Sequence, residues 1–291
     1  MPFKPFPHPT PWKWLLSALL LAGALSGCAA LHEKQGEWIF QPSTRDWGGT
    51  SVAQSDMAVT WITFQSVATG QPVRLHALWH AAYPQDAART AAAPVLLYLH
   101  GARWNVTGST HRVRRMQELG FSVLALDYRG FGKSDGKQPS EELAYEDALA
   151  AWNWLAVQYP QRKRFIFGHS LGGAIAIHLA AQVTDEAGTI VEGAFTSIPD
   201  VVRSMPWGWL PVSPLITQRF DAVGKVGALG APLLVVHGSE DSLVRPELGR
   251  RLFEAASEPK AFVLVNGGSH HNTNAVGQAQ YREAIARLFG L

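Results

Sequence analysis

Cysteine is almost absent from this chain: Cys28 is the only one among 291 residues. A single cysteine excludes a disulfide within the chain. An excess of charge of one sign is also missing, because 25 basic and 23 acidic residues give a net charge of +2. That balance provides no electrostatic attraction for a polyanion, so we expect no nucleic-acid partner.

The sequence also lacks internal repeats, low-complexity tracts and any apolar run of the ~20 residues that a membrane-spanning helix needs. The composition is 47% hydrophobic and 16% charged, which excludes a disordered chain and is sufficient for a large core. Large α/β folds often form a single unit of about 250 residues, so we expect one main domain.

Residues 1–27 have the pattern of a signal peptide. Lys4 and Lys13 precede an apolar run of only 12 residues, 14–25, which is too short for a permanent spanning anchor. The run ends in Leu25-Ser26-Gly27-Cys28, which resembles a bacterial lipobox. In that motif small residues before the cysteine admit the signal peptidase, and the thiol accepts a diacylglycerol.

Cys28 is therefore predicted to be lipidated and to become the first residue of a membrane-tethered protein in the bacterial cell envelope. The residue after Cys28 is Ala29 and not an aspartate, which resembles lipoproteins sorted to the outer membrane. This would place the domain in the periplasm, an oxidising compartment that suits a chain without further cysteines.

Residues 28–57 show little periodicity and are interpreted as an extension whose aromatic residues cover the domain, which we expect to span 58–291. The alternating segments 59–64 and 73–79 predict a β-hairpin, and 81–93 reads as a loop. His76 and His80 share a face of the second strand, but they have no third ligand in sight, so we predict no metal site.

Short apolar runs then alternate with segments of helical spacing. The runs predict strands over 95–99, 121–126, 164–167, 190–195, 233–236 and 262–265. The intervening segments predict helices over 111–119, from 141 to just before 160, over 171–183 and near 278–289. This alternation indicates an α/β fold with a mostly parallel sheet and helices on both faces.

A candidate nucleophile lies between one predicted strand and the next helix. Gly168-His169-Ser170-Leu171-Gly172 matches the G-x-S-x-G nucleophile elbow in the strand-turn-helix context that the motif requires. The glycines permit a sharp turn that exposes the Ser170 hydroxyl. The backbone amide of Leu171, at the start of the helix, is a natural donor to an oxyanion.

A serine nucleophile needs a base, and the base needs an acid that orients it. With this elbow the chain order is serine, acid, histidine. Asp241 follows the predicted strand 233–236 and is our acid, with Glu240 as the alternative. His270 lies in the loop after 262–265 and is our preferred base, with His271 as its rival.

The second oxyanion donor is expected in the loop after strand 95–99, where His100-Gly101-Ala102-Arg103 suggests the amide of Ala102. Gly132-Lys133-Ser134 looks like the end of a phosphate-binding loop. That loop would need a glycine at position 127, which is Asp127, and no nucleotide fingerprint occurs elsewhere. We therefore expect no cofactor.

Together these motifs resemble the α/β-hydrolase family. In chain order they are His-Gly at 100–101, Asp-Tyr-Arg-Gly-Phe-Gly at 127–132, Gly-His-Ser-Leu-Gly-Gly at 168–173, His-Gly-Ser-Glu-Asp at 237–241 and Gly-Ser-His at 268–270. Residues 195–200 and 219–221 further resemble a small-lidded branch of serine hydrolases that includes protein depalmitoylases and related esterases.

In that branch the catalytic histidine commonly stands in Gly-Thr-His-Asn-Asp-Thr, so Gly268-Ser269-His270-His271-Asn272-Thr273 aligns His270 with it. His271 departs from the pattern by replacing an asparagine. The resemblance implies that Ser170 attacks an acyl carbon, that His270 moves its proton and that Asp241 orients the imidazole. The amides of Ala102 and Leu171 would stabilise the oxyanion.

The resemblance also implies a cap at about 197–229, where Met205, Trp207 and Trp209 are hypothesised to line an acyl pocket. The expected activity is hydrolysis of a carboxylic ester or thioester, such as a palmitate ester, through an acyl-enzyme on Ser170. A peptidase of the same fold and a non-catalytic envelope lipoprotein are the alternatives, since the fold does not determine the substrate.

Overall fold

The computed structural model describes residues 27, 30–45, 56–83, 85–136 and 138–291. Cys28 and nearly all of the predicted signal peptide lie outside these residues. Among the described helices, none has the length and apolar character needed to cross a membrane.

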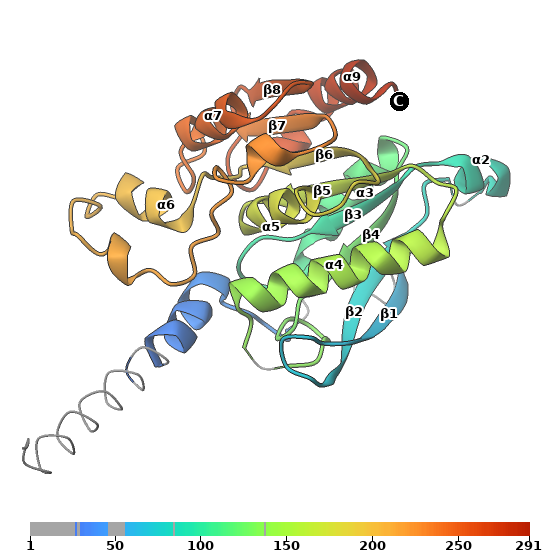
Figure 1. The fold of residues 1–291 in the computed structure, drawn as a ribbon. Helices are drawn as coiled ribbons and strands as arrows, with labels where there is room; N and C mark the ends of the chain where they lie inside the picture. Colours follow the sequence, from blue (N-terminus) through green and yellow to red (C-terminus); the bar gives the residue numbers. More distant parts are fainter. Residues whose placement is uncertain (1–26, 28–29, 46–55, 84, 137) are drawn as a thin grey trace, which may run out of the picture.

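One sheet of eight strands organises the described chain, in the order β1-β2-β4-β3-β5-β6-β7-β8 (Figure 1). β2 pairs antiparallel with β1 and β4, and every other pairing is parallel. This confirms the predicted mostly parallel α/β sheet. The strands are β1 (Ala58–Gln65), β2 (Pro72–His80), β3 (Val95–Leu99), β4 (Ser122–Leu126), β5 (Arg164–His169), β6 (Glu186–Glu192), β7 (Leu233–Gly238) and β8 (Lys260–Val265).

Helices cover both faces of the sheet, so the central strands are buried on both sides and consist mostly of apolar residues. Successive residues of β3 alternate between two cores: Leu97 packs with residues of one face and Leu96 with residues of the other. The first core is closed by α4 (Glu141–Gln158), α5 (Leu171–Ala180) and α7 (Pro246–Ala255), and the second by α3 (Thr110–Glu118) and α9 (Gln278–Phe289).

The structure corrects the end of one predicted strand and the interpretation of one predicted loop. β6 ends at Glu192, not at residue 195, because Gly193 adopts φ +57° and turns the chain out of the sheet. The expected loop 81–93 contains the short helix α2 (Ala87–Ala92), whose first turn is capped by the Asp86 side chain accepting a hydrogen bond from the Arg89 amide.

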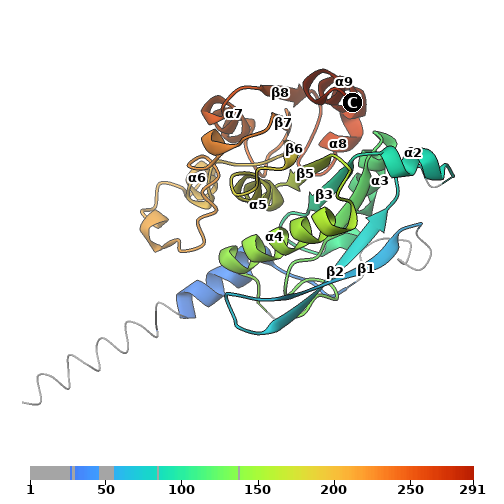
Figure 2. The ribbon, with the colours of Figure 1, turned by 45° about the vertical axis from the view of Figure 1, so that its right-hand side comes forward.

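The extension is helical over 30–40 and packs firmly on the domain (Figures 1 and 2). Phe40 is fully buried, with its ring edge-on to Phe131 and Phe220 at centroid distances of 6.1 and 5.6 Å. A side chain at Gly36 would place its Cβ 2.7 Å from the carbonyl oxygen of Pro139, so only glycine permits this approach. By contrast, Trp38 of the same helix is 63% exposed.

The chain between β6 and β7 contains α6 (Ile198–Ser204) and the short 3-10 turns Ser213–Leu215 and Val226–Ala228. We call residues 197–229 the cap. It lies beside the helix at 30–40 in both views (Figures 1 and 2). The side chain of Gln35 joins the two, because its Nε2 donates to the carbonyl of Leu215 (2.6 Å) and its Oε1 accepts from the amide of Thr217 (2.7 Å).

Candidate active site

Ser170 lies in the tight turn between β5 and α5, with φ +55° and ψ −119°. Few residues other than glycine adopt a positive φ, so the turn is strained. Its two glycines cannot be replaced: a Cβ on Gly168 would lie 2.2 Å from the Gly172 carbonyl oxygen, and one on Gly172 would lie 2.1 Å from the Leu99 carbonyl oxygen. The close fit of β5, α5 and β3 thus presents Ser170 above the carboxyl edge of the sheet.

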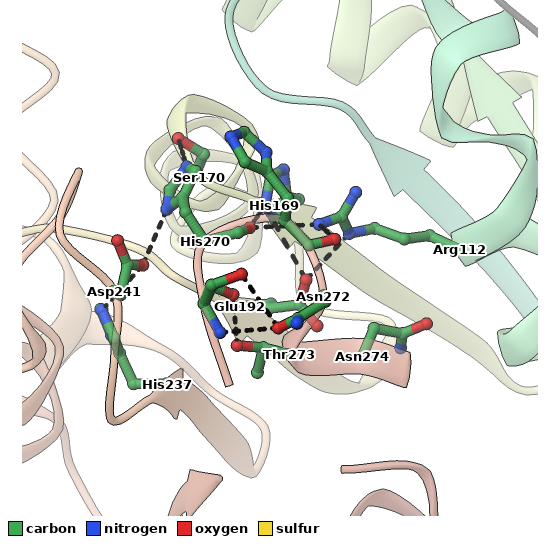
Figure 3. A network of polar contacts seen from close by, with 12 residues as sticks. Arg112, His169, Ser170, Glu192, His237, Asp241, His270, Asn272, Thr273 and Asn274 are labelled. Atoms are coloured by element: carbon green, nitrogen blue, oxygen red, sulfur yellow. Dashed lines mark hydrogen bonds and ion pairs between the residues drawn. The ribbon is translucent and has the colours of Figure 1, made fainter. Parts of the chain in front are cut away.

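The structure brings Ser170, His270 and Asp241 into one hydrogen-bonded chain (Figure 3). Nε2 of His270 is 2.9 Å from Oγ of Ser170, and Nδ1 of His270 is 2.7 Å from Oδ2 of Asp241. Nδ1 therefore donates to the carboxylate, and Nε2 is left to accept the serine proton. His271 is exposed, and its ring stands edge-on to that of His270 at 5.5 Å.

Asp241 is held as a carboxylate by several donors. Its Oδ1 accepts the backbone amides of Leu243 (3.0 Å) and Val244 (2.8 Å), and Nε2 of His237 lies 3.4 Å from its Oδ2. Burial opposes ionisation, but hydrogen bonds from His237 and His270 outweigh it and hold the pKa of the Asp241 carboxyl below its usual range. Glu240, the alternative acid, is exposed.

A buried ion pair supports the loop that carries His270. Nε of Arg112, in α3, donates to Oε1 of Glu192 at the end of β6 (2.9 Å). Nη2 of Arg112 donates to the backbone carbonyls of His271 (2.9 Å) and His270 (3.2 Å). Tyr281 donates its hydroxyl to the second oxygen of Glu192. The pair links α3, β6 and α9 to the histidine loop.

Neither Arg112 nor Glu192 was among the residues predicted from the sequence. A partial signal was present in the positions of the two residues. Arg112 has the spacing of the apolar face of α3, one turn before Met116, and Glu192 directly follows Ile190 and Val191 in β6. Charged residues at buried positions are usually paired, but the sequence does not identify the partner.

His169, which precedes the nucleophile, also supports the loop. Its Nε2 donates to the carbonyl of His270 (3.0 Å). Burial, together with the positive charge of Arg112 and the nearby His270, holds the pKa of His169 well below its usual value. A neutral His169 therefore acts as a fixed donor, and together with Arg112 it makes three hydrogen bonds to the backbone carbonyls of His270 and His271 (Figure 3).

The two residues predicted to donate to an oxyanion, Ala102 and Leu171, line the same pocket as Ser170, which has a volume of about 200 Å³. Leu171 is the first residue of α5, where the amide has no intrahelical acceptor and the helix dipole is positive. Ala102 lies in the loop after β3, which approaches the nucleophile so closely that a Cβ on Gly101 would be 3.1 Å from the Ser170 Cβ. Ala102 and Leu171 thus line the same pocket as Ser170, and we expect their amides to face a developing oxyanion there.

The loop that carries Ala102 is braced by the extension. The residues after it, Arg103 and Trp104, have positive φ values of 69° and 62°. The carbonyl of Phe40 accepts a hydrogen bond from the amide of Arg103 (2.7 Å), and the amide of Ser43 donates to the carbonyl of Trp104 (3.0 Å). These contacts stabilise a backbone that would otherwise relax.

The histidines that suggested a metal site, and the serine that suggested a phosphate-binding loop, are each in contact with other residues of the fold. Nδ1 of His76 is 2.8 Å from the Asp127 carboxylate, and His80 lies 3.6 Å from Asp56. Ser134 donates its hydroxyl to the Asp127 carbonyl (2.7 Å). Across the described ranges, no three His, Cys, Asp or Glu side chains are grouped so as to hold a metal ion.

The cap residues divide according to their exposure. Met205 lines the pocket around Ser170, and Trp207 lines an adjoining groove. Trp209 is 81% exposed and lines neither space. Of the large cap residues hypothesised to line an acyl pocket, Met205 and Trp207 are therefore suitably placed and Trp209 is not.

Comparison with known proteins agrees with this geometry. A family model described as serine aminopeptidase, S33, matches residues 90–221. The uncharacterized protein Rv2307c of Mycobacterium tuberculosis is 34% identical over 200 residues, which cover 68% of this chain and 70% of that protein. This chain belongs to the α/β-hydrolase family.

Further relatives of this α/β-hydrolase include lysophosphatidylserine lipase ABHD12 of Danio rerio, which is 30% identical over 208 residues. That match covers 63% of the chain and 54% of the lipase, so the chain spans about half the length of that relative. This part of the chain is therefore similar to a protein named as a lipase.

Solved structures of esterases share the fold of this α/β-hydrolase. The Pyrococcus furiosus esterase Pf2001 superposes with a TM-score of 0.67 at 20% identity, covering 87% of this chain and 99% of the esterase. Est1E of Butyrivibrio proteoclasticus, solved with ferulic acid bound, gives a TM-score of 0.64 at 18% identity and covers 80% of this chain and 100% of Est1E. At these identities the likeness concerns the fold alone.

Proposed function

We propose that this α/β-hydrolase cleaves carboxylic esters or thioesters through an acyl-enzyme on Ser170. The observation that carries the proposal is the unbroken chain of contacts from Ser170 Oγ through His270 to Asp241, at 2.9 and 2.7 Å. A serine hydroxyl becomes an effective nucleophile only beside such an oriented base.

In the first step Ser170 Oγ attacks the acyl carbon while Nε2 of His270 takes its proton. The carbonyl oxygen becomes an oxyanion that accepts hydrogen bonds from the amides of Ala102 and Leu171. His270 then gives the proton to the leaving alcohol or thiol as the acyl bond breaks. Water, deprotonated by His270, releases the acid from Ser170 by the same route in reverse.

Asp241 stabilises the imidazolium that forms on His270 during both steps. Because its pKa is held below the usual range, Asp241 stays ionised throughout the neutral pH range. It therefore maintains the tautomer of His270 in which Nε2 faces the serine.

A peptidase is the second candidate, suggested by the description of the matching family model. An aminopeptidase must bind a free, positively charged amine, for which a carboxylate is the usual partner. The described residues that line the Ser170 pocket include no Asp or Glu, whereas Arg103 and Arg112 are present. Apolar side chains such as Phe195, Ile198 and Val201 line the cap side. This lining favours an acyl ester or thioester.

The chemistry is tested with a fluorophosphonate probe, which labels only an activated serine. We expect the purified full-length protein to be labelled and Ser170→Ala to remain unlabelled. A panel of p-nitrophenyl esters, acyl thioesters and aminoacyl anilides then measures selectivity, with turnover of the first two expected. No labelling of either protein would support the non-catalytic lipoprotein instead, and equal labelling of wild type and Ser170→Ala would contradict Ser170 as the nucleophile.

We also propose that the protein is tethered to the bacterial envelope through lipid on Cys28, with the outer membrane and a periplasmic orientation as the expected location. The support is the lipobox-like Leu25-Ser26-Gly27-Cys28, which precedes the helix at 30–40 by one residue. Metabolic labelling with an alkyne fatty acid should mark the wild type and not Cys28→Ser. Labelling that persists in Cys28→Ser would contradict the anchor.

A further inference from the structure

A second cavity lies between the helix at 30–40 and the cap. It has a volume of about 510 Å³, which lies within the range of about 300–1,000 Å³ typical of small-molecule sites. One wall comes from the helix and the other from α6 and the turns that follow it, and the lining consists of Leu31, Gln35, Trp38, Ile39, Ile198, Val202, Met205, Trp207, Val212, Leu215 and Ile216. We call it the helix–cap groove.

The groove adjoins the catalytic pocket. Ile39, Ile198 and Met205 line both spaces, so the two cavities share a boundary made of three apolar side chains. A molecule that extended from Ser170 into the groove would meet only these apolar side chains at the boundary. The catalytic pocket alone, at about 200 Å³, is below the usual size of a ligand site, so an extension is needed for a large substrate.

The lining of the groove selects for hydrocarbon. Apart from the indole N–H groups of Trp38 and Trp207, Gln35 is its one polar side chain, and both ends of the Gln35 amide are already used in hydrogen bonds to Leu215 and Thr217. No charged residue is present in the lining. A ligand with polar groups along its length would lose its hydrogen bonds to water here and gain none, whereas a methylene chain gains from the burial of its surface.

The rim of the groove carries large exposed apolar side chains. Trp38 is 63% exposed, Trp207 47% and Leu215 60%. Tryptophans concentrate where proteins meet the membrane–water interface. Because Cys28 is close in sequence to the helix that bears Trp38, the proposed lipid anchor would keep this rim near a lipid surface.

We propose that the helix–cap groove holds the long acyl chain of the substrate, with the scissile carbonyl at Ser170 and the chain passing Ile39, Ile198 and Met205. The helix at 30–40 is then a wall of the substrate site. This inference rests on the proposed acyl hydrolase activity and deepens it: the substrates are esters or thioesters of long-chain acids.

The first test fills the groove away from Ser170. Val202 of α6 lines the groove but not the catalytic pocket, whereas its neighbour Arg203 lines neither, and its side chain is 58% exposed. For Val202→Trp we expect kcat/KM on p-nitrophenyl esters of 12 to 16 carbons to fall at least tenfold, mainly through KM, and that on acetate and butyrate to stay within about twofold. Arg203→Trp, the matched control, should follow the wild type at every length.

The inference fails if Val202→Trp and Arg203→Trp share one chain-length profile, or if Val202→Trp loses activity equally at all lengths while it remains folded. If Val202→Trp does not fold, Trp207→Ala takes its place, with the exposed Trp209→Ala as its control. Trp207→Ala should change the preference for chain length and Trp209→Ala should not. An identical profile for these two variants would also contradict the groove.

A binding measurement separates the groove from the chemistry. The full-length Ser170→Ala protein is titrated with dansylundecanoic acid, and Val202→Trp is introduced into it. We expect saturable binding that Val202→Trp weakens at least tenfold. Binding without turnover by the wild type would refute the proposed hydrolase and retain the groove. Turnover of short esters without binding would refute the groove and retain the hydrolase.

Discussion

The guanidinium of Arg112 donates a hydrogen bond to the backbone carbonyl of His270 at 3.2 Å, across 158 residues of sequence. The same guanidinium is paired with the buried Glu192, so its position is determined from two sides. Arginine suits this task because its planar fork serves several acceptors at once. Arg112 also lines the pocket around Ser170, and these contacts make it a positioning residue for His270.

Arg112→Lys should reduce kcat by about 10- to 100-fold with little change in KM, because a small displacement of the base is enough to slow proton transfer. Lysine keeps the charge opposite Glu192 but cannot reach all three acceptors. The measurement is steady-state hydrolysis of p-nitrophenyl butyrate. Arg114→Lys is the control on the same helix, since Arg114 makes only a surface ion pair with Asp56. A purely structural role would lower the melting temperature and leave kcat per folded molecule unchanged.

His270→Ala should reduce kcat by about 10³-fold or more, because the general base is removed. His271→Ala should reduce it less than about tenfold, since His271 is exposed and contributes to the loop chiefly through its backbone carbonyl. Comparing the two variants by ester hydrolysis and by the rate of fluorophosphonate labelling decides between the adjacent histidines. An equal loss in both would mean that the roles assigned here are wrong.

Asp241→Asn should lower kcat on the order of 10³- to 10⁴-fold, because an amide stabilises the wrong histidine tautomer. Glu240→Gln, one residue away and exposed, should remain within about twofold of the wild type. The depressed pKa of Asp241 also stabilises the fold at neutral pH, a contribution that is lost only as pH falls through the folded pKa. Circular dichroism at pH 7 must therefore confirm that the asparagine variant is folded.

Glu186, at the start of β6, provides a test of stability against pH. Burial raises the pKa of its carboxyl to about 7, with a smaller contribution from the neighbouring Asp185. Because the pKa of Glu186 is higher in the folded than in the unfolded state, the protein has its full stability below the unfolded pKa. It loses part of that stability as pH rises through about 7. Glu186→Gln should thus unfold like the wild type at pH 4 and be more stable at pH 8.

The expected gain at pH 8 is on the order of 1–2 kcal/mol, because one pKa unit corresponds to about 1.4 kcal/mol and solvent screening reduces the full effect. Urea unfolding at both pH values measures it. Glu283→Gln, at an exposed position of α9, is the control and should change neither curve. A gain for Glu186→Gln that is equal at pH 4 and pH 8 would contradict the ionisation argument.

Phe40→Ala tests whether the extension belongs to the folded domain. Truncating a fully buried phenylalanine costs about 3–5 kcal/mol, and the loss would also loosen the loop that presents Ala102. Trp38→Ala, two residues earlier and 63% exposed, should cost less than about 1 kcal/mol. Denaturant unfolding of both variants gives the comparison. Similar values would mean that the helix at 30–40 contributes little to the fold.

The local sequence was enough to predict the sheet and the nucleophile. The βα alternation appears in short apolar runs, because strands buried on both faces need continuous hydrophobic residues. The elbow around Ser170 was predictable because its sharp turn leaves no room for a side chain at positions 168 and 172, and both are glycine. The chain order of serine, acid and histidine then predicted Asp241 as the acid.

Other features depend on contacts between distant segments. His270, not His271, faces Ser170, in a loop whose backbone carbonyls accept hydrogen bonds from Arg112 and His169. The residues at 28–57 showed little periodicity, yet 30–40 is helical, because the helix is stabilised by Phe40 and Gln35 packing on remote parts of the domain.

By itself, then, the sequence determined the fold class and the short-range geometry of the turn that bears Ser170, because periodicity and steric limits act between near neighbours in the chain. The sequence favoured His270 over His271, and the tertiary structure shows His270 in contact with the serine. Tertiary structure alone paired Arg112 with Glu192 and set the helix at 30–40 against the cap to form an apolar groove. Those outcomes depend on how side chains from separate elements fill space and pair their charges, and no local pattern encodes that.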